Sequence, residues 1–327
     1  MDLFNSFKDT IFLKADSDLN RQLAGLKEIR EKLSDTREID KDIKIHEYGI
    51  FGENQIEYEL KNAHIGMYVL HDVTFEYDGN KAQIDYLIFT RGYFYLIECK
   101  NLIGNVTVDK SGQFFREYEL DGKKIKEAIY SPYTQALRHQ DMLKKVWTKS
   151  HSKLDNFIFG RFHEEDFFKP LVVLANPKGF LNTYYAPKDI KSSIIRADQL
   201  ISYIKRDLDK MKSSELSSEK NTKKAAEIWL SRSIVDNRDV ISKYVNQMSE
   251  DNNDELIEKN LREFRKEKSQ KMNIPLYYVF TDDELNSLIK NKPKTLDELR
   301  SSGILSSVKV KYHGKEILDI LNMEVKK

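Results

Sequence analysis

Two carboxylates and a lysine lie at the ends of two neighbouring apolar runs in the first third of the chain. Asp85 stands near the start of the first run, and Glu98 and Lys100 end the second. Like charges placed close together repel, and each raises the other's pKa unless a cation lies between them. Mg²⁺ prefers carboxylate oxygens, and a neighbouring lysine can orient a water molecule or stabilise a developing oxyanion. These residue types fit metal-assisted hydrolysis.

The spacing of the two runs predicts how these side chains meet. Arg91-Gly92 separates the runs and is typical of a two-residue turn between antiparallel strands. In that register Asp85 faces Glu98, and directly opposed residues lie roughly 4.5–5.5 Å apart at Cβ. Side chains alternate along a strand, so Glu98 and Lys100 share a face and Cys99 points to the other. The hairpin is therefore expected to gather the three charged groups at one end.

Both faces of this hairpin are apolar, which is typical of a central strand pair covered on both sides. One face is expected to carry Ile84, Tyr86, Ile88, Tyr95 and Ile97, and the other Leu87, Phe89, Phe94 and Leu96. Charged groups are unexpected at the end of such an apolar hairpin and therefore need a structural or functional explanation. The alternative to a metal site is a buried Asp–Lys–Glu ion-pair network, because such networks perturb pKa values as active sites do.

The length and composition of the chain limit its number of domains, its partners and its location in the cell. The chain has 327 residues, 40% of them apolar and 33% charged, and its formal net charge is +1. The length predicts about two domains, and the near-neutral charge gives no general attraction to nucleic acid. Cys99 is the single cysteine and cannot form an internal disulfide. Without an apolar run of about 18 residues or a signal peptide pattern, we expect a soluble cytoplasmic protein that does not span a membrane.

The segments around the hairpin must position it. Residues 1–46 predict a helical arm, which either packs on the main domain or forms a homo-oligomer contact. Gly49 and Gly52 are expected to break the chain before a new helix. Glu53 would then lie in the first turn, where the helix dipole alone favours a carboxylate. The functional alternative is that Glu53 points from the helix end toward a metal at the hairpin.

A second helix is expected to follow the strands. Ser131 is a good N-cap and Pro132 a good first helical residue. Gln135 on this helix is either an ordinary surface residue or a contact to a phosphate or a water molecule. Further apolar runs at 157–159 and 171–174 predict strands. The alternation of helices and strands up to residue 210 predicts an α/β fold with a mixed central sheet flanked by helices.

The last quarter of the chain has a different pattern, an all-helical one. A polar stretch and a helical piece, residues 211–253, are interpreted as a helical linker. Thr281 with Glu284, and Thr295 with Glu298, each form the sequence pattern of a capping box. Basic residues here are interleaved with acidic ones, which favours solvated helix faces over a single basic stripe.

Four short motifs in order resemble the nuclease-related domain (NERD) family of the PD-(D/E)XK nuclease superfamily. They are Gly52-Glu53, the QID that ends at Asp85, the IECKN that contains Glu98 and Lys100, and Ser131-Pro132 with Gln135. The resemblance implies a domain over residues 47–210, with Glu53, Asp85 and Glu98 as acidic metal-site residues. It implies Lys100 as the active-site lysine and Gln135 as an accessory residue. Ile84 and Ser131 stand where the superfamily usually has Pro and the family usually has Asn.

The C-terminal region, residues 254–327, resembles the HRDC domain, a small helical module. The resemblance rests on the run Asn273-Ile274-Pro275-Leu276-Tyr277-Tyr278-Val279-Phe280, followed by Leu285, Pro293, Leu299 and Gly303, and on Tyr312-His313-Gly314. Modules of this family often bind nucleic acid and sometimes bind protein. Both alternatives stay open because the charge here is mixed.

The hairpin and the resemblance together predict a metal-dependent nuclease that hydrolyses phosphodiester bonds, with DNA favoured over RNA as its substrate. Asp85 and Glu98, helped by Glu53 and the carbonyl of Cys99, would hold Mg²⁺ or Mn²⁺, while Lys100 would position the attacking water. The HRDC-like module would target nucleic acid. DNA processing and defence against foreign DNA are both compatible with this activity. The alternative is a non-catalytic nucleic-acid-binding or protein-interaction adaptor with a nuclease-like fold.

Overall fold

The computed structural model describes residues 7–150, 168–235 and 239–322. The chain divides into two compact units. The first, Met1–Ala24 with Lys41–Arg238, is called the sheet unit below. The second, Gly25–Asp40 with Asp239–Lys327, is called the helical unit.

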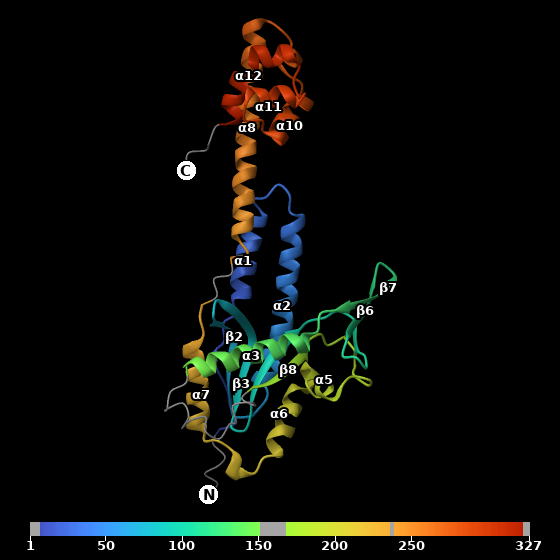
Figure 1. Cartoon of the computed structure of the whole chain (residues 1–327), viewed down its shortest axis with the longest axis vertical. Helices are drawn as coiled ribbons and strands as arrows, with labels where there is room; N and C mark the ends of the chain where they lie inside the picture. Colours follow the sequence, from blue (N-terminus) through green and yellow to red (C-terminus); the bar gives the residue numbers. More distant parts are fainter. Residues whose placement is uncertain (1–6, 151–167, 236–238, 323–327) are drawn as a thin grey trace. The chain divides into compact units, whose positions relative to one another are not determined.

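The sheet unit is built on a six-stranded mixed sheet in the order β1-β2-β3-β4-β8-β10. Figure 1 labels β2, β3 and β8 of this sheet. The two central hairpin partners run antiparallel, whereas β8 lies parallel to β4 and β10 lies parallel to β8. The strands are β1 (Thr10–Lys14), β2 (Met67–Tyr77), β3 (Asn80–Thr90), β4 (Phe94–Lys100), β8 (Phe168–Leu174) and β10 (Ile194–Arg196). The expected strand at 171–174 is present in β8, whereas the one at 157–159 lies outside the described residues.

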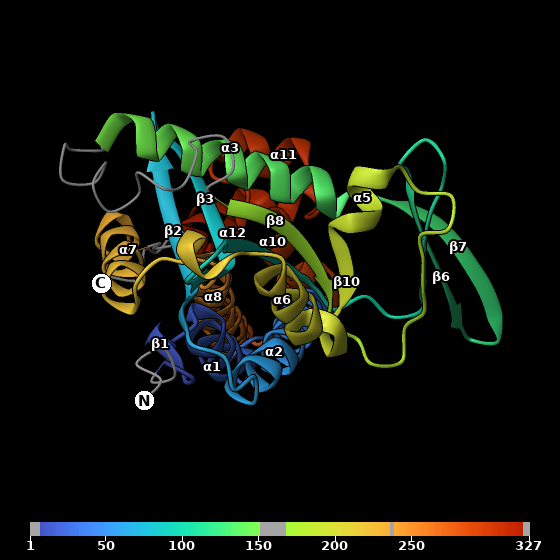
Figure 2. The same ribbon diagram turned by 90° about the horizontal axis from the view of Figure 1, so that it is seen from below.

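Helices cover both faces of this sheet, which confirms the expected α/β class (Figure 2). Helices α3 (Pro132–Ser150) and α7 (Glu219–Arg232) pack on one face, where Trp147 and Trp229 are buried. Helices α2 (Arg37–Lys61) and α6 (Leu200–Asp209) cover the other face through Ile56 and Ile204. A sheet buried on both sides explains why both faces of the hairpin are apolar.

A smaller sheet and several short elements complete the sheet unit. The smaller sheet has the order β7-β6-β5-β9, and β6 and β7 extend away from the main sheet (Figure 2). Its strands are β5 (Asn105–Val108), β6 (Phe114–Leu120), β7 (Lys123–Ile129) and β9 (Leu181–Asn182). The remaining helices are α5 (Lys188–Ser192) and the 3₁₀ turns Ala197–Gln199 and Ser213–Glu215. The N-terminal segment, expected to be helical, also contributes the edge strand β1 beside β2.

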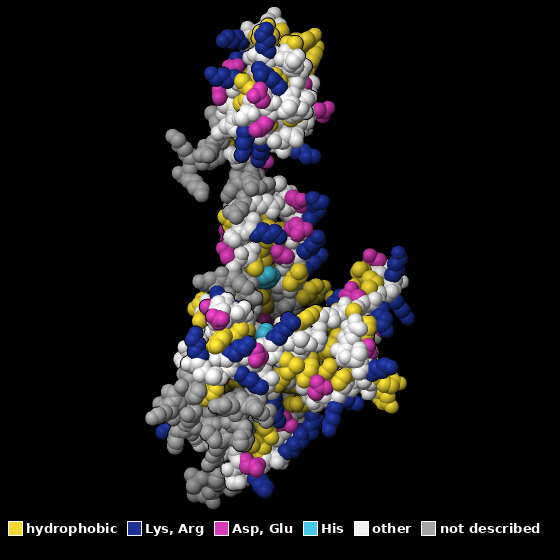
Figure 3. Space-filling model, in the orientation of Figure 1, with side chains coloured by type: hydrophobic (Ala, Val, Ile, Leu, Met, Phe, Trp, Pro, Cys, Tyr) yellow, Lys and Arg dark blue, Asp and Glu magenta, His cyan; other side chains and the backbone are white. Residues whose placement is uncertain are grey.

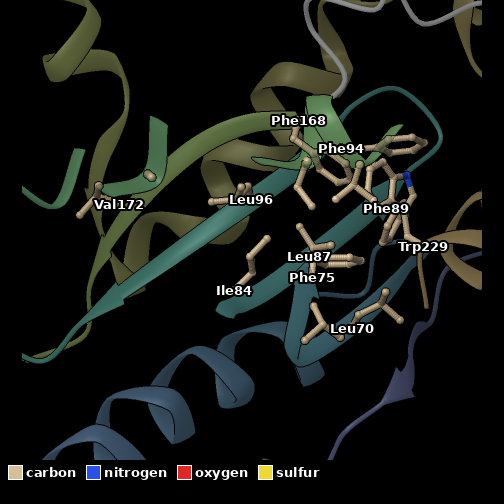
Figure 4. Close-up of a cluster of buried hydrophobic side chains, with 14 of the residues drawn as sticks. Leu70, Phe75, Ile84, Leu87, Phe89, Phe94, Leu96, Phe168, Val172 and Trp229 are labelled. Atoms are coloured by element: carbon tan, nitrogen blue, oxygen red, sulfur yellow. The ribbon is translucent and has the colours of Figure 1, made fainter. Parts of the chain in front are cut away.

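The register of the central hairpin is confirmed. Tyr86 pairs with Ile97 and Phe89 with Phe94, so Arg91-Gly92 is the two-residue turn. The expectation that Ile84 shares a face with Tyr86 is wrong, because Ile84 packs in the cluster that contains Leu87 (Figure 4).

Side chains stop alternating regularly between the two faces of the sheet at Asp72 in β2 and at Asp85 in β3. Asp72 has a left-handed backbone with φ of 52°, which is uncommon outside glycine and locally interrupts the strand. Its neighbours His71 and Val73 still pair with Tyr86 and Ile84 on β3. The reversal of faces therefore falls at Asp85, the residue on which the expected chemistry depends.

Helix α2 differs from the sequence expectation. The structure shows one continuous helix through Gly49 and Gly52, so Glu53 lies in mid-helix and the explanation by a first-turn dipole is wrong. A side chain at Gly52 would place its Cβ 2.8 Å from Asn101 Cβ and 3.2 Å from Cys99 Sγ. Glycine is therefore needed here for close packing of the helix against the end of β4, not for a chain break.

The helical unit packs five helices around its own core of leucine, isoleucine, valine and phenylalanine side chains. They are α8 (Ser242–Met272), α9 (Leu276–Val279), α10 (Asp282–Asn291), α11 (Leu296–Ser301) and α12 (Ser307–Leu321). The described N-terminal portion of this unit is the end of α1 (Asp18–Arg30) and the start of α2. Thr281 and Glu284 form the expected capping box, and Thr295 caps α11.

In the three described stretches of the chain, no helix combines the length and the apolar character needed to cross a membrane.

Candidate active site

The charged end of the central hairpin opens into a hollow of about 400 Å³. Five elements line it, namely α1, α2, β3, β4 and α3, and the hollow lies at the carboxyl end of β4. All of the predicted side chains are brought together here. The lining includes Glu53, Asp85, Glu98, Cys99, Lys100 and Gln135.

Glu98 is the centre of a polar network on the α3 side of the hollow. Its side chain is only 3% exposed, and Lys100 Nζ donates to Glu98 Oε1 at 2.6 Å. The same ammonium donates to Gln135 Oε1 at 3.0 Å. Gln135 is therefore not an ordinary surface residue, because its amide oxygen orients the lysine. The network holds the Lys100 ammonium at the wall of the hollow.

Of the three acidic side chains at the hollow, Asp85 has the fewest partners for its negative charge. Its Oδ2 accepts the backbone N–H of Cys99 at 2.6 Å, which is the amide that would otherwise continue the ladder toward Ile84. The described chain supplies no hydrogen bond to the other oxygen, Asp85 Oδ1. Burial raises the pKa of Asp85 well above its usual range, and the nearby charge of Glu98 raises it further. A divalent cation would reverse both effects.

Glu53 is held by a histidine that the sequence did not single out. His71 Nε2 lies 3.0 Å from Glu53 Oε2, and His71 Nδ1 lies 2.9 Å from the carbonyl of Ala15. Burial alone would lower the pKa of His71, but the hydrogen bond and the charge of Glu53 outweigh it and raise the pKa. Tyr86 stacks on the imidazole with ring centroids 4.3 Å apart and donates from its hydroxyl to the Glu53 carbonyl at 3.0 Å.

His139 is a second histidine at the site. Its Nδ1 lies 3.2 Å from Glu98 Oε2 but lacks hydrogen-bond geometry, so this buried nitrogen has no hydrogen-bond partner in the described structure. The sequence could have identified His139 as a site residue, because it follows Gln135 by one helical turn and lies on the same face of α3. His71 gave no such signal, because its contact with Glu53 joins a strand to a distant helix.

The donor atoms at the hollow fit a hard divalent cation. Carboxylate and carbonyl oxygens are the ligands that Mg²⁺ takes, and the under-compensated Asp85 lies beside the buried Glu98. In the present arrangement, no group of three His, Cys, Asp or Glu side chains of the described residues could hold a metal ion. In this arrangement one oxygen of Glu98 accepts from Lys100, and one oxygen of Glu53 lies at His71.

Cys99 contributes its backbone rather than its thiol. Burial, and then the charge of Asp85, raise the pKa of the thiol well above its usual range, so the side chain stays protonated and unreactive. Its N–H binds Asp85, as described above. A role for its carbonyl as a metal ligand stays a prediction.

Comparison with known families assigns the chain to a nuclease-related class of protein. The family model described as Nuclease-related domain (NERD) matches residues 48–175. That of the HRDC domain matches residues 254–321. The chain thus carries a NERD domain followed by an HRDC domain, as the motifs suggested. No curated protein and no solved structure gave a significant match. The two domains indicate a nuclease-related function and nucleic-acid binding.

The surface of the helical unit carries both signs of charge, intermingled on the face seen in Figure 3. Many of these charges are paired. Lys268 lies 2.7 Å from Glu316, and Arg262 lies 2.7 Å from Glu258. Exposed pairs of this kind contribute little to stability and leave no uniform basic stripe.

Proposed function

We propose that the sheet unit is a metal-dependent nuclease that hydrolyses phosphodiester bonds, with DNA as its preferred substrate. The observation that carries this proposal is the convergence of Glu53, Asp85, Glu98 and Lys100 on one hollow from three different elements. In a purely structural network, placing the partly buried Asp85 beside Glu98 would only raise the free-energy cost of ionising Asp85. Strongly perturbed groups in a hollow mark functional sites more often than chance.

Asp85 and Glu98 would hold Mg²⁺ or Mn²⁺, with Glu53 and the carbonyl of Cys99 completing the oxygen ligands. Such a metal acidifies a bound water and polarises the phosphate. In the chain itself, Lys100 supplies a positive charge for the developing charge on the phosphate or orients the attacking water. Gln135 holds the lysine through its amide oxygen and keeps its amide nitrogen for the substrate. His71 positions Glu53 as described above.

The HRDC domain would add affinity through phosphate contacts. Each phosphate that a lysine or arginine neutralises releases counterions, so this binding should weaken steeply as salt increases. DNA processing and defence against foreign DNA both suit such an enzyme. Homo-oligomer formation through the N-terminal segment also stays a prediction, and the molecular mass of the full chain in solution would test it.

One observation favours a second candidate, a non-catalytic adaptor. The carboxylates Glu53 and Glu98 already have cationic or imidazole partners, as in a structural ion-pair network. In that case the fold would bind nucleic acid or protein, and metal would have no effect. The two candidates differ in what happens to a nucleic acid substrate when metal is supplied.

Cleavage of a substrate panel tests the proposal. Linear duplex, supercoiled plasmid, single-stranded DNA and RNA would each be incubated with Mg²⁺, Mn²⁺ or EDTA. We expect metal-dependent cleavage by the wild type that Lys100→Ala abolishes. Lys61→Ala is a matched control, because Lys61 pairs with Glu57 on the exposed surface of α2. Absence of cleavage under every condition, or cleavage that Lys100→Ala leaves intact, would favour the adaptor.

A further inference from the structure

A second hollow, of about 560 Å³, adjoins the candidate active site and is more apolar in character. Its volume falls within the range of about 300–1,000 Å³ that is usual for small-molecule pockets. We propose that it binds an unpaired nucleobase of the substrate strand, next to the phosphate that is cleaved. The chain would then act preferentially on single-stranded DNA or on duplexes with a single-stranded end. The inference rests on the proposed function, because it assigns a substrate to the same site.

Two aromatic side chains line this hollow. Tyr48 and Phe51 lie three residues apart on α2, hence on one face, and are 51% and 46% exposed. Exposed aromatic rings on a rigid helix offer a flat surface on which a base can stack, and stacking accepts any base. A base inside an intact duplex cannot reach such a surface, because both of its faces are already stacked.

The charges around the rings suit a nucleotide better than a neutral apolar ligand. Lys44 and Lys178 line the hollow, and neither has an ion pair with any other described residue. Glu47 is the one acidic residue of this lining, so the charged lining residues sum to +1, two lysines minus one glutamate. An ammonium free of a carboxylate partner can bind the backbone phosphate beside a stacked base. The occupant is therefore expected to be apolar and flat with an anionic neighbour.

Asn101 connects this hollow to the candidate active site. It lines both hollows and directly follows Lys100 in the chain. Its Nδ2 donates to the carbonyl of Tyr48 at 2.7 Å, which fixes the end of β4 to α2. Gly49, the next residue along α2, lines the first hollow. A nucleic acid strand whose scissile phosphate lies near Lys100 would thus place a neighbouring base beside Tyr48.

The far wall is held in place before any ligand binds. It consists of Asn176, Pro177 and Lys178, which follow β8. Arg196 on β10 donates to the carbonyls of Pro177, at 3.0 Å, and of Gly179. A wall fixed in this way costs little further ordering when a base enters.

Binding of a fluorescent single-stranded oligonucleotide tests the inference without cleavage. The full chain would be titrated, in EDTA, into single-stranded DNA that carries one 2-aminopurine, whose fluorescence falls when it stacks. We expect quenching at one position of the strand. The double variant Tyr48→Leu with Phe51→Leu should remove it and weaken binding by about 5- to 150-fold, the loss expected for one stacked base. A blunt duplex of the same length should bind equally well to both proteins.

Two further variants make the result specific. Tyr58→Leu changes an aromatic side chain that is 66% exposed on the same helix but lines neither hollow, and it should bind like the wild type. Tyr48→Phe with Phe51→Tyr keeps both rings and should retain the quenching. Lys44→Gln with Lys178→Gln should reduce the salt dependence of single-strand binding by about 0.7 per lysine.

The outcomes separate this inference from the proposed function. Unchanged quenching and affinity in the Tyr48→Leu, Phe51→Leu variant would overturn the nucleobase pocket, even if Lys100→Ala abolished cleavage. An equal loss of affinity for the blunt duplex would overturn it as well. Conversely, a selective loss of single-strand binding would support the pocket even if no cleavage were found.

Discussion

Two charged side chains, Arg265 in the helical unit and Asp85 in the sheet unit, differ in how the chain satisfies them. In the helical unit the buried Arg265 donates to the carbonyl of Phe280 at 3.1 Å and to the exposed Asp282 at 2.8 Å. In the sheet unit Asp85 lies beside Glu98, and its pKa is raised as a result of burial and of that neighbour. The charge of Arg265 is satisfied by two groups of the chain, whereas Asp85 has one hydrogen bond, from the Cys99 backbone, and a neighbouring carboxylate of the same charge.

The same contrast appears in the local structure. Helices α10, α11 and α12 of the helical unit begin with threonine or serine caps that obey the usual rules. In the sheet unit, Asp72 has a positive φ, the alternation of β3 changes at Asp85, and a glycine in mid-helix gives α2 its close approach. Departures from local rules that gather at one place are expected at functional sites. These departures around the hollow are consistent with the proposal that it is the active site.

The largest effect we expect is on cleavage. Glu98→Gln keeps the size of the side chain but removes the charge that pairs with Lys100, so we expect the rate to fall by at least about 10²-fold. Glu127→Gln is the matched control, because Glu127 pairs with Arg116 outside the hollow, and its rate should match that of the wild type. A Glu98→Gln protein that cleaves at the wild-type rate would show that cleavage does not need the charge of Glu98. The hollow of the sheet unit would then no longer differ in function from the helical unit.

Stability without metal should sharpen the comparison. Arg265→Met should destabilise the helical unit by about 1–3 kcal/mol, because two hydrogen bonds to a buried charge are lost. Asp85→Asn should leave the sheet unit as stable as before or more stable. A raised folded-state pKa means that ionised Asp85 costs stability above its unfolded pKa of about 3.9, and the cost grows as pH rises through the folded value.

Urea unfolding in EDTA can follow the two units separately. Trp147 and Trp229 are the two tryptophans of the chain and both lie in the sheet unit, so tryptophan fluorescence reports on that unit. Circular dichroism includes the helical unit. A clear loss of stability in Asp85→Asn would show that the carboxylate is satisfied by the protein itself, which contradicts the contrast drawn above.

A smaller, pH-dependent effect is expected at His71. Its folded-state pKa is raised because Glu53 outweighs the effect of burial. The contribution is therefore fully present below the unfolded pKa of about 6.5 and is lost as pH rises through the folded value. His71→Gln should be about 1–3 kcal/mol less stable than the wild type at low pH, and the difference should shrink at higher pH. A difference that does not change with pH would mean that the imidazole carries no charge in this pair.

Much of the site could be predicted because it depends on one hairpin. The turn at Arg91-Gly92 fixes the pairing of β3 and β4 locally, and this brings Asp85 toward Glu98 whatever the rest of the chain does. The mixed sheet with helices on both faces also followed from the pattern of elements. Thr281 and Ser131 could be recognised as helix caps because a cap depends only on the next three residues.

The parts that could not be predicted depend on contacts between distant segments. Gly52 was interpreted as a chain break, whereas its role is the approach of α2 to Asn101. His71 became part of the site only because β2 passes beside Glu53 of that helix. The face of Ile84 could not be predicted for a related reason, since β2 and β3 both reverse their faces beside Asp72, whose φ is positive. Sequence periodicity contains none of this information.

The most direct test of the account is calorimetric titration of Mn²⁺ and Mg²⁺ into the full chain and into Asp85→Asn. We expect the wild type to bind metal more tightly as pH rises and to release protons on binding, because Asp85 must lose its proton to act as a ligand. Asp85→Asn should bind at least tenfold more weakly, about 1.4 kcal/mol. Equal binding by the two proteins, or no binding by either, would contradict the claim that a metal binds at Asp85 and Glu98.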